Sequence, residues 1–230
     1  MATIAKRSAP RRKRRAGRPR GDDQDLRAHL LDVAIAQFSR IGIAATSLRA
    51  IAVEANVTPA MLHYYFGDKA RLVQALIDER LLPALLPMRT RLEQVGDDPA
   101  VLIENFVRGI GAVVANHPWL PSLWVREVLC EGGALREVLF NQTIPNLPQL
   151  LAQRFSLAHA DGRLNADLDP RLLVVSLVGL TLFPAAGAPI WQRMFGADGL
   201  GADVMLKHTL ALLDRGVGAA GLAAGSGEAA

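Results

Sequence analysis

The fold is decided by residues 46–69, which read TSLRAIAVEANVTPAMLHYYFGDK. Thr46 or Ser47 is placed to cap a helix, because a hydroxyl oxygen can accept a hydrogen bond from a free backbone N–H of the first turn. The apolar residues that follow recur at helical spacing, at Leu48, Ile51, Ala52 and Ala55. This part of the stretch therefore predicts a short helix with one buried face.

A second short helix follows after a brief turn. Asn56 tolerates the left-handed backbone conformation found at helix ends. Thr58 and Pro59 then supply a capping residue and a proline at the first helical position, and Gly67 ends the helix. Two short helices joined by residues 55–58 predict a helix-turn-helix unit, whose second helix fits the major groove of DNA.

The polar and aromatic side chains of this unit are candidates for contacts with DNA. The apolar pattern assigns the core to Leu48, Ile51, Ala52, Val57, Leu62 and Phe66. The side chains left for the surface combine hydrogen-bonding groups with aromatic rings, and they are Thr58, His63, Tyr64, Tyr65 and Lys69. Such groups suit phosphates and base edges. The alternative is that the three consecutive aromatic residues form an ordinary core cluster.

The run 46–69 resembles the DNA-binding signature of the TetR family, and the resemblance continues to about Leu82. The resemblance implies an all-α fold, with an N-terminal three-helix helix-turn-helix domain and a C-terminal helical bundle. It also implies a homodimer that binds a double-stranded DNA operator and a small-molecule effector. The implied function is that of a ligand-responsive transcriptional regulator. The resemblance favours a repressor that its effector releases from the operator.

The resemblance also assigns individual positions. It implies backbone contacts by Thr46, Ser47 and Arg49, and phosphate anchors at Tyr65 and Lys69. The residues that it places on the recognition helix are Thr58, Pro59, Ala60, Met61, His63 and Tyr64. This sequence departs from the family at three of the matched positions. Asn56 stands where glycine is common, His63 where tyrosine is frequent, and Tyr65 where histidine is frequent.

Charge and composition divide the chain into four expected parts. Residues 1–20 hold nine of the 26 basic residues and no acid, so the remaining 17 basic residues are outnumbered by 22 acids. We expect residues 1–21 to be a disordered basic arm that binds polyanions. We expect a DNA-binding domain over 22–67, a ligand-binding and dimerisation domain over 68–216, and a disordered tail of small residues over 217–230.

The cysteine and histidine content excludes several kinds of site. Cys130 is the single cysteine, so an internal disulfide and a thiolate metal cluster are both excluded. The histidines show no metal-ligand spacing, and we expect neither a metal nor a cofactor. The N-terminus lacks the apolar segment of a secretory signal, which with the single cysteine predicts a cytoplasmic protein.

An enzyme is the weakest of the functional alternatives. Residues 216–221, GVGAAG, match the dinucleotide-binding pattern, but they follow a predicted helix and lie close to Ala230. That pattern is informative only after a strand and before a helix. We therefore expect no catalytic residues. The other alternative is a DNA-binding protein without a small-molecule ligand, whose DNA binding would not respond to any such molecule.

The segment from Leu172 to Gln192 contains no charged residue. Its length approaches that of a membrane span, but prolines and glycines interrupt it. We prefer burial in a dimer interface, because a helix that is apolar all round must cover every face. The expected interface uses helices over about 170–190 and 201–215. Its apolar area would come from Leu177, Leu180, Leu206, Leu210 and Leu213.

The effector site is predicted from large apolar groups near polar ones. In a helical bundle such a set suits a small, largely apolar effector, although a plain core has the same composition. The candidate ligand contacts are Phe106, His117, Trp119, Trp124, Glu127, Phe140, Asn141 and Phe183. For Glu127 a structural ion pair is the preferred alternative, because it shares the stripe of its apolar neighbours.

Overall fold

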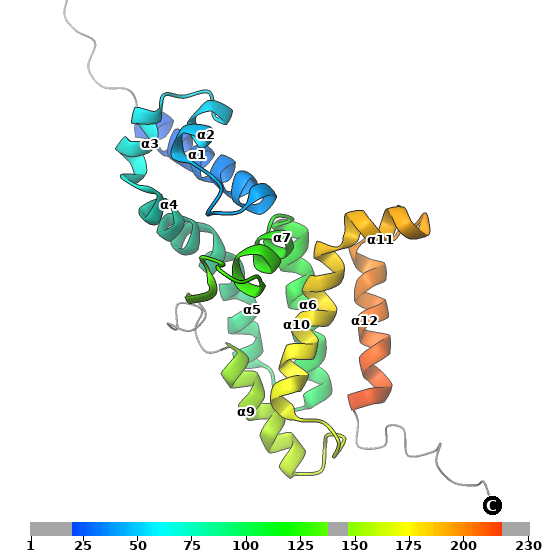
Figure 1. Cartoon of the computed structure of the whole chain (residues 1–230). Helices are drawn as coiled ribbons and strands as arrows, with labels where there is room; N and C mark the ends of the chain where they lie inside the picture. The colour runs from blue at the N-terminus through cyan, green and yellow to red at the C-terminus, as the bar shows by residue number, and fades with distance from the viewer. Residues whose placement is uncertain (1–19, 138–146, 218–230) are drawn as a thin grey trace, which may run out of the picture.

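The computed structural model describes residues 20–137 and 147–217, and these residues form helices and turns with no β-strand (Figure 1). The predicted all-α fold is confirmed. Three of the predictions fall outside the described residues: nearly all of the basic arm, nearly all of the C-terminal tail, and the candidate ligand contacts Phe140 and Asn141.

Three helices form a headpiece at one end of the molecule: α1 (Arg20–Ile41), α2 (Leu48–Glu54) and α3 (Pro59–Phe66). Their apolar stripes meet in a common core made by Leu30, Leu31, Ala34, Phe38, Ile51, Ala52, Leu62 and Phe66, all of them buried. Gly42 ends α1 with a φ of 92°, a value that glycine adopts without steric cost. The headpiece core therefore follows the helical spacing of the sequence.

A single helical path leads from the headpiece into the rest of the chain (Figure 1). It consists of α4 (Lys69–Leu76), the π-helical turn η1 (Ile77–Leu81) and α5 (Leu82–Gln94). Pro83 lies in the first turn of α5, directly after the wider π turn. A proline has no N–H to donate there, so the first turn is a position that it tolerates.

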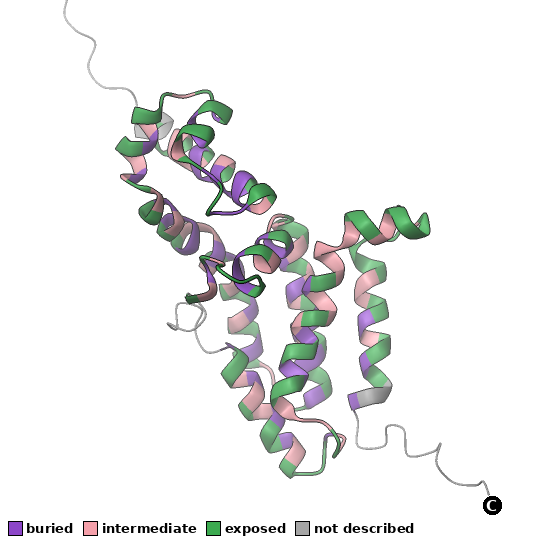
Figure 2. Ribbon diagram, viewed as in Figure 1, coloured by how far each residue is buried: buried purple, intermediate pink, exposed green. Residues whose placement is uncertain are grey.

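The remaining helices form the body. They are α6 (Pro99–Asn116), α7 (Leu120–Trp124), the π-helical turn η2 (Val125–Leu129), α9 (Leu147–Ala160), α10 (Pro170–Ala186), α11 (Ala188–Phe195) and α12 (Ala202–Val217). α6 and α10 lie at the centre, with α5 and α9 on one side and α12 on the other. Figure 2 shows buried positions recurring along α6, α10 and α12, whereas α11 buries none.

Two hydrophobic cores fill the molecule. One lies within the body, and the other joins the headpiece to α7 and η2 through Leu120, Leu123 and Val128. The ring of Trp124 packs against both cores. The headpiece therefore shares its core with part of the body rather than closing on itself.

The apolar segment that was predicted to form one helix over about 170–190 is divided between α10 and α11. Within the described residues no single helix is long and apolar enough to cross a membrane; α10 and α11 together pass that test by length and composition, but they are bent by 67°. For Leu177 and Leu213 the assignment to the dimer interface was wrong, whereas for Leu180, Leu206 and Leu210 it stays a prediction. Leu177 and Leu213 are buried inside their own subunit, and three half-buried leucines pack there as well: Leu180, Leu206 and Leu210.

Candidate nucleic-acid interface

The turn between α2 and α3 has the predicted backbone. Asn56 adopts a φ of 54°, in the left-handed region, so its predicted role at the end of α2 is confirmed. The turn is closed by the N–H of Val57, which donates to the carbonyl of Ala52 at 2.9 Å. The first turn of α3 is closed by Met61, whose N–H donates to the carbonyl of Thr58 at 2.9 Å.

One face of α3 is buried and the other is presented to solvent. Leu62 and Phe66 point into the headpiece core. The opposite face is exposed at Thr58, Pro59, Ala60, His63 and Tyr64, and Met61 is half-buried. Tyr64 is 72% exposed, and its hydroxyl gives this face a hydrogen-bonding group on an aromatic ring. α3 is therefore available along the length that a recognition helix would use.

Three hydroxyl and guanidinium groups at the starts of α2 and α3 differ in availability. The side chain of Ser47 caps α2 by accepting the N–H of Ala50 at 3.1 Å, which leaves its O–H free to donate. Thr58 occupies the capping position of α3 without making a side-chain cap bond. Arg49 is exposed on α2 and takes part in no ion pair within the described residues.

Thr46 occupies a different environment from the other candidate contacts. It is only 2% exposed, and its hydroxyl donates to the carbonyl of Gly42 at 2.7 Å. Its backbone N–H also points to the carbonyl of Gly42, at 3.2 Å. Thr46 therefore stabilises the loop between α1 and α2 beneath the surface, and a phosphate contact through its side chain would require that loop to open.

Tyr65 and Lys69 are held by the headpiece itself. The hydroxyl of Tyr65 donates to the carboxylate of Asp23 on α1, and its ring packs edge-to-face against Tyr64 with centroids 5.0 Å apart. Lys69 donates from Nζ to the carbonyl of Ala44 at 3.0 Å. An ammonium group has three donors, so this contact positions Lys69 and leaves it able to meet a phosphate.

His63 sits where α3 ends. Its Nδ1 lies 2.6 Å from the carbonyl of Gly67, the residue that ends the helix with a φ of 76°. The ring is therefore fixed at one nitrogen, which must carry the proton if it donates to that carbonyl. The other nitrogen then remains as the hydrogen-bonding group of an exposed side chain.

Polar contacts that the sequence did not indicate fix α2 and α3 on α1. Gln37 is buried on α1 and donates to the carbonyl of Ala50 at 3.1 Å and to the carboxylate of Glu54 at 2.7 Å. Arg40 pairs with the same carboxylate at 3.0 Å. These contacts set the position of α2, and no local sequence pattern marks them because the partners belong to different helices.

Arg27 performs a similar task for α3. Its guanidinium lies 4.8 Å from the ring centroid of Phe66 and forms an ion pair with Glu79 of η1. The hydrogen bond to Glu79 raises the pKa of Arg27 above its usual value. Arg27 thus connects the end of α3 with the helical path that leads to the body.

The candidate ligand contacts do not converge on one pocket. The rings of His117 and Trp119 lie 5.6 Å apart at the end of α6, whereas Phe106 is buried in the body core and Phe183 is 70% exposed on α10. Trp124 has a buried Nε1 with no hydrogen-bond partner in the parts of the chain that the structure describes. Whether these side chains bind a ligand stays a prediction.

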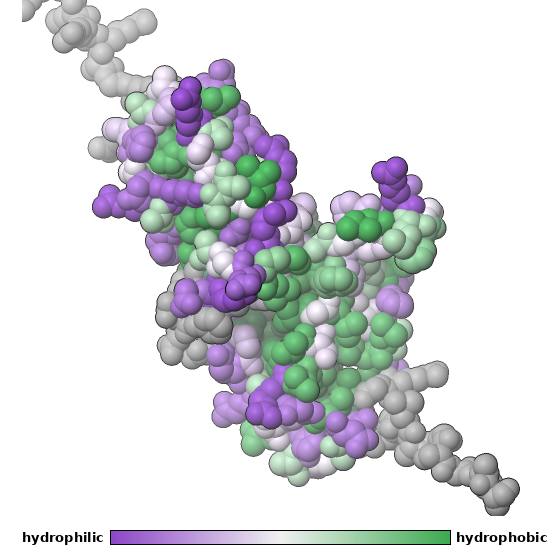
Figure 3. All heavy atoms as spheres, viewed as in Figure 1, coloured by the Kyte–Doolittle hydropathy of each residue, from purple (hydrophilic) through white to green (hydrophobic). Residues whose placement is uncertain are grey.

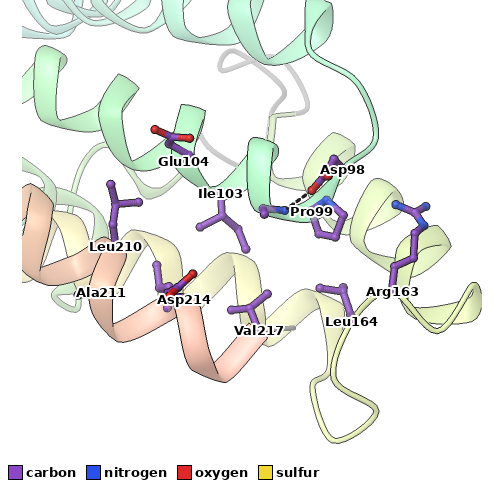
Figure 4. Close-up of a pocket in the computed structure, with 12 residues that line it drawn as sticks. Asp98, Pro99, Ile103, Glu104, Arg163, Leu164, Leu210, Ala211, Asp214 and Val217 are labelled. Carbon is purple, nitrogen blue, oxygen red and sulfur yellow. Dashed lines mark hydrogen bonds between the residues drawn. The ribbon is translucent and has the colours of Figure 1, made fainter. Parts of the chain in front are cut away.

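A cavity of about 730 Å³ lies instead at the far end of the body (Figure 4). It opens between the start of α6, the loop after α9 and the end of α12. Apolar side chains make up much of its lining, namely Pro99, Ile103, Leu164, Leu210, Leu213 and Val217. Ala100 and Ala211 also line it, and its charged residues are Asp98, Glu104, Arg163 and Asp214. No local sequence pattern indicated this cavity, because its walls come from distant parts of the chain.

Known proteins resemble this chain both in the region of the headpiece and over most of its length. Residues 30–76 match the family described as bacterial regulatory proteins, tetR family. The chain is 28% identical over 195 residues to the HTH-type transcriptional repressor Rv3405c of Mycobacterium tuberculosis, covering 84% of this chain and 87% of that protein. It is 28% identical over 189 residues to the HTH-type transcriptional regulator RutR of Escherichia coli, covering 81% and 85%.

The fold has a counterpart among solved structures. The ketosteroid transcriptional regulator KstR2 of Mycobacterium tuberculosis superimposes with a TM-score of 0.67 and 19% sequence identity. The match covers 84% of this chain and 94% of that chain, so it includes the body as well as the headpiece. At this level of identity the likeness concerns the fold.

Proposed function

Since the chain belongs to the tetR family of bacterial regulatory proteins and is a DNA-binding transcriptional regulator, we propose that it is a repressor that binds a palindromic operator as a homodimer. In this proposal a small, largely apolar effector binds the body and releases the repressor from its operator. The observation that carries the proposal is the open face of α3, where Tyr64 is 72% exposed beside other hydrogen-bonding side chains.

The assignment of DNA contacts is part of the proposal. Arg49, Ser47 and Lys69 hold phosphates from the starts of α2 and α4. The side chains that meet base edges come from the open face of α3, and they are Thr58, Pro59, Ala60, Met61, His63 and Tyr64. Tyr65 contributes through its hydroxyl at the edge of this face. Phosphate contacts position the protein, whereas base contacts give it sequence preference.

The homodimer is supported by an apolar face that the subunit leaves open. On α10 the residues Leu172, Val175 and Phe183 are 63%, 65% and 70% exposed, and on α12 Val204 and Leu212 are 45% and 54% exposed. Figure 3 shows hydrophobic side chains gathered over the face of the body that α10 and α12 share. A second copy would cover this face through a two-fold contact.

Gly179 fits the same dimer. It lies on the exposed stripe of α10 between Val175 and Phe183, and a Cβ added to it would meet no atom within 4 Å in the subunit. Its lack of a side chain lets the backbone of a partner helix approach closely. An obligate interface of this kind buries on the order of 2,000 Å² or more in total.

The effector site is proposed in the cavity at the far end of the body. Its volume of about 730 Å³ lies within the range of small-molecule sites, and its largely apolar lining suits an apolar effector. Among the candidate ligand contacts that the structure describes, none lines it. The proposal includes a cytoplasmic location, where bacterial DNA lies, and no enzymatic activity.

The DNA-binding proposal is tested by selection from random-sequence DNA with the full chain, followed by footprinting of the selected fragments. We expect a protected inverted repeat whose half-sites lie about one helical turn apart or slightly more. Failure to protect any inverted repeat, at low or high salt, would remove the proposal.

The effector proposal needs a separate test. A panel of small apolar compounds is screened for release of the wild-type protein from the selected DNA, and active compounds are repeated on Ala100→Phe, which fills part of the cavity. We expect the variant to bind DNA and to lose the response. A response that is unchanged in the variant places the effector elsewhere, and no release by any compound favours a DNA-binding protein without a ligand.

A further inference from the structure

Glu127 is a buried carboxylate at the junction of headpiece and body. It lies on η2 and is only 4% exposed. Its Oε1 accepts the N–H of Ile43 at 2.8 Å, and its Oε2 accepts the N–H of Ala134 at 3.0 Å. Ile43 follows α1 in the headpiece, and Ala134 follows the turn after η2. One carboxylate therefore joins two backbone segments that are distant in the sequence.

Within the described residues, Glu127 does not form the structural ion pair that was predicted from the sequence. Its two oxygens are occupied by backbone N–H groups, and none of the ion pairs formed among the described residues includes it. Burying a charge is costly unless hydrogen bonds replace its lost hydration. Here backbone donors supply them, so Glu127 is tied to the position of these two segments.

Two glycines allow the close approach around Glu127. A Cβ added to Gly42 would lie 3.1 Å from Glu127 Oε1 and 3.1 Å from Arg126 Cδ, and Gly42 also has a positive φ of 92°. A Cβ added to Gly133 would lie 2.3 Å from the carbonyl oxygen of Glu127. That carbonyl accepts the N–H of Leu135 at 3.0 Å. The carboxylate and the backbone of Glu127 are thus both enclosed by the two segments.

The π-helical turn places Glu127 at this junction. η2 is closed by the N–H of Cys130, which donates to the carbonyl of Val125 at 3.0 Å, one residue further than in an α-helix. Such turns are uncommon and occur frequently at functional sites. α7 contacts α1 directly before this turn. The hydroxyl of Ser39 on α1 donates to the carbonyl of Ile35 at 2.8 Å and also lies 3.3 Å from the carbonyl of Trp119.

The headpiece has a second attachment to the body on another side. There the chain itself continues through α4 and η1, and two ion pairs strengthen the connection, Arg27 with Glu79 and Arg80 with Asp32 at 2.9 Å. An attachment at η1 alone leaves the headpiece able to rotate about that helical path. The contact from Glu127 to Ile43 acts together with the core that the headpiece shares with α7 and η2, and it adds a directed polar contact that restricts this rotation.

We propose that Glu127 is a positioning residue for DNA binding, which fixes the orientation of the headpiece on the body by holding the loop after α1 to the turn after η2. The inference rests on the proposed function, because it concerns how a dimer presents two copies of α3 to one DNA molecule. A loose headpiece loses its freedom of orientation when it binds DNA, and the cost of that lost freedom weakens the complex.

The test compares Glu127→Gln with Glu131→Gln in the full-length protein, on DNA selected with the wild type. Glutamine keeps the size of Glu127 but replaces one acceptor oxygen with a donor, so one backbone N–H loses its partner. Glu131 is exposed four positions along the chain, and its variant removes the same charge. Affinity for DNA and amide hydrogen exchange at Ile43 and Ala134 are measured for each protein.

We expect Glu127→Gln to weaken DNA binding by at least about ten-fold, the effect of losing a buried hydrogen bond to a charged group. Exchange at Ile43 and Ala134 should accelerate in the free protein, while exchange in α6 stays slow. In the wild type, DNA should slow exchange at Ala134 as well as in α3, and in the variant only in α3. Glu131→Gln should match the wild type.

Equal affinity and equal exchange in the two variants would overturn the inference. If Glu127→Gln does not fold, Gly133→Ala provides the same comparison, because its Cβ displaces the turn from Glu127 while the carboxylate remains. Unchanged exchange at Ala134 in that variant also overturns the inference. Absence of DNA-dependent protection in α3 of the wild type would instead count against the proposed function, and the exchange rates of the free proteins would still report on the junction.

Discussion

At the scale of single residues, the candidate DNA contacts fall into two groups that differ in how firmly the headpiece holds them. Lys69 and Tyr65 each make a hydrogen bond within the headpiece, to Ala44 and Asp23 respectively. Tyr64 extends from α3 with most of its ring and its hydroxyl exposed. Residues of the first kind suit contacts with the regular phosphate backbone, and residues of the second kind suit contacts that differ between base pairs.

For Lys69→Ala we expect a loss of DNA affinity that is similar on all sequences. The substitution removes one cation that displaces counterions from phosphates, so the slope of log affinity against log salt should shrink by about one unit. Salt titrations on selected and unrelated DNA measure both quantities. A changed consensus after renewed selection with this variant would show that Lys69 reads bases instead.

For Tyr64→Ala we expect a change of sequence preference rather than a uniform loss. A side chain that meets base edges contributes about 1–3 kcal/mol of discrimination at its position. Selection followed by sequencing compares the variant with Leu86→Ala, which removes an exposed apolar side chain from α5. If both variants return the wild-type consensus, Tyr64 does not contribute to recognition.

At the scale of elements, α10 has apolar side chains on two faces, of which one is buried and the other exposed. Leu173, Val174 and Leu177 pack into the body core, whereas Leu172 and Val175 remain exposed on the other face. A helix that is apolar on both faces needs cover on both. The subunit covers only one, so the other face of α10 is the one that the proposed partner would cover.

For Val175→Glu we expect monomers and loss of operator binding, although the headpiece is unchanged. A charge in the centre of an apolar interface costs the energy of its desolvation and finds no partner there. Light scattering and a DNA-binding assay are applied together. The control is Leu157→Glu, which places the same charge on an exposed position of α9. A dimeric Val175→Glu with full affinity would contradict the interface, whereas Leu177→Glu would disturb folding because Leu177 is fully buried.

Sequence reasoning succeeds where the structure depends on neighbouring residues. Asn56 in the turn and Pro59 at the start of α3 act on their own segment, and their effects were predictable. Glu127 was not predictable in the same way, because its partner Ile43 is distant in the sequence and offers only a backbone N–H. The same reason hid the cavity and the burial of Thr46, since both depend on which helices become neighbours.

At the scale of the whole molecule, charge is distributed unevenly along the chain. The first 20 residues carry nine basic residues and no acid, whereas acids outnumber bases in the rest. A net negative body is repelled by DNA, so positive charge near the headpiece has to offset that repulsion. The arm would then set how strongly the protein binds DNA of any sequence.

For deletion of residues 1–19 we expect a folded dimer, because this stretch of sequence holds no apolar stripe to bury. Affinity for unrelated DNA should fall more than affinity for selected DNA, since contacts by charge carry no sequence information. Competition binding at several salt concentrations measures the ratio of the two affinities. An unfolded or monomeric truncated protein would show that the arm has a structural role.

The lone Cys130, whose N–H closes η2, is exposed, and no other thiol competes with it for reagents. A nitroxide attached there would sit three residues from Glu127 without a preliminary round of cysteine removal. In a two-fold dimer, pulsed electron paramagnetic resonance would then report one interspin distance. The width of that distance distribution would measure how well the region around η2 is ordered, in free solution and on DNA.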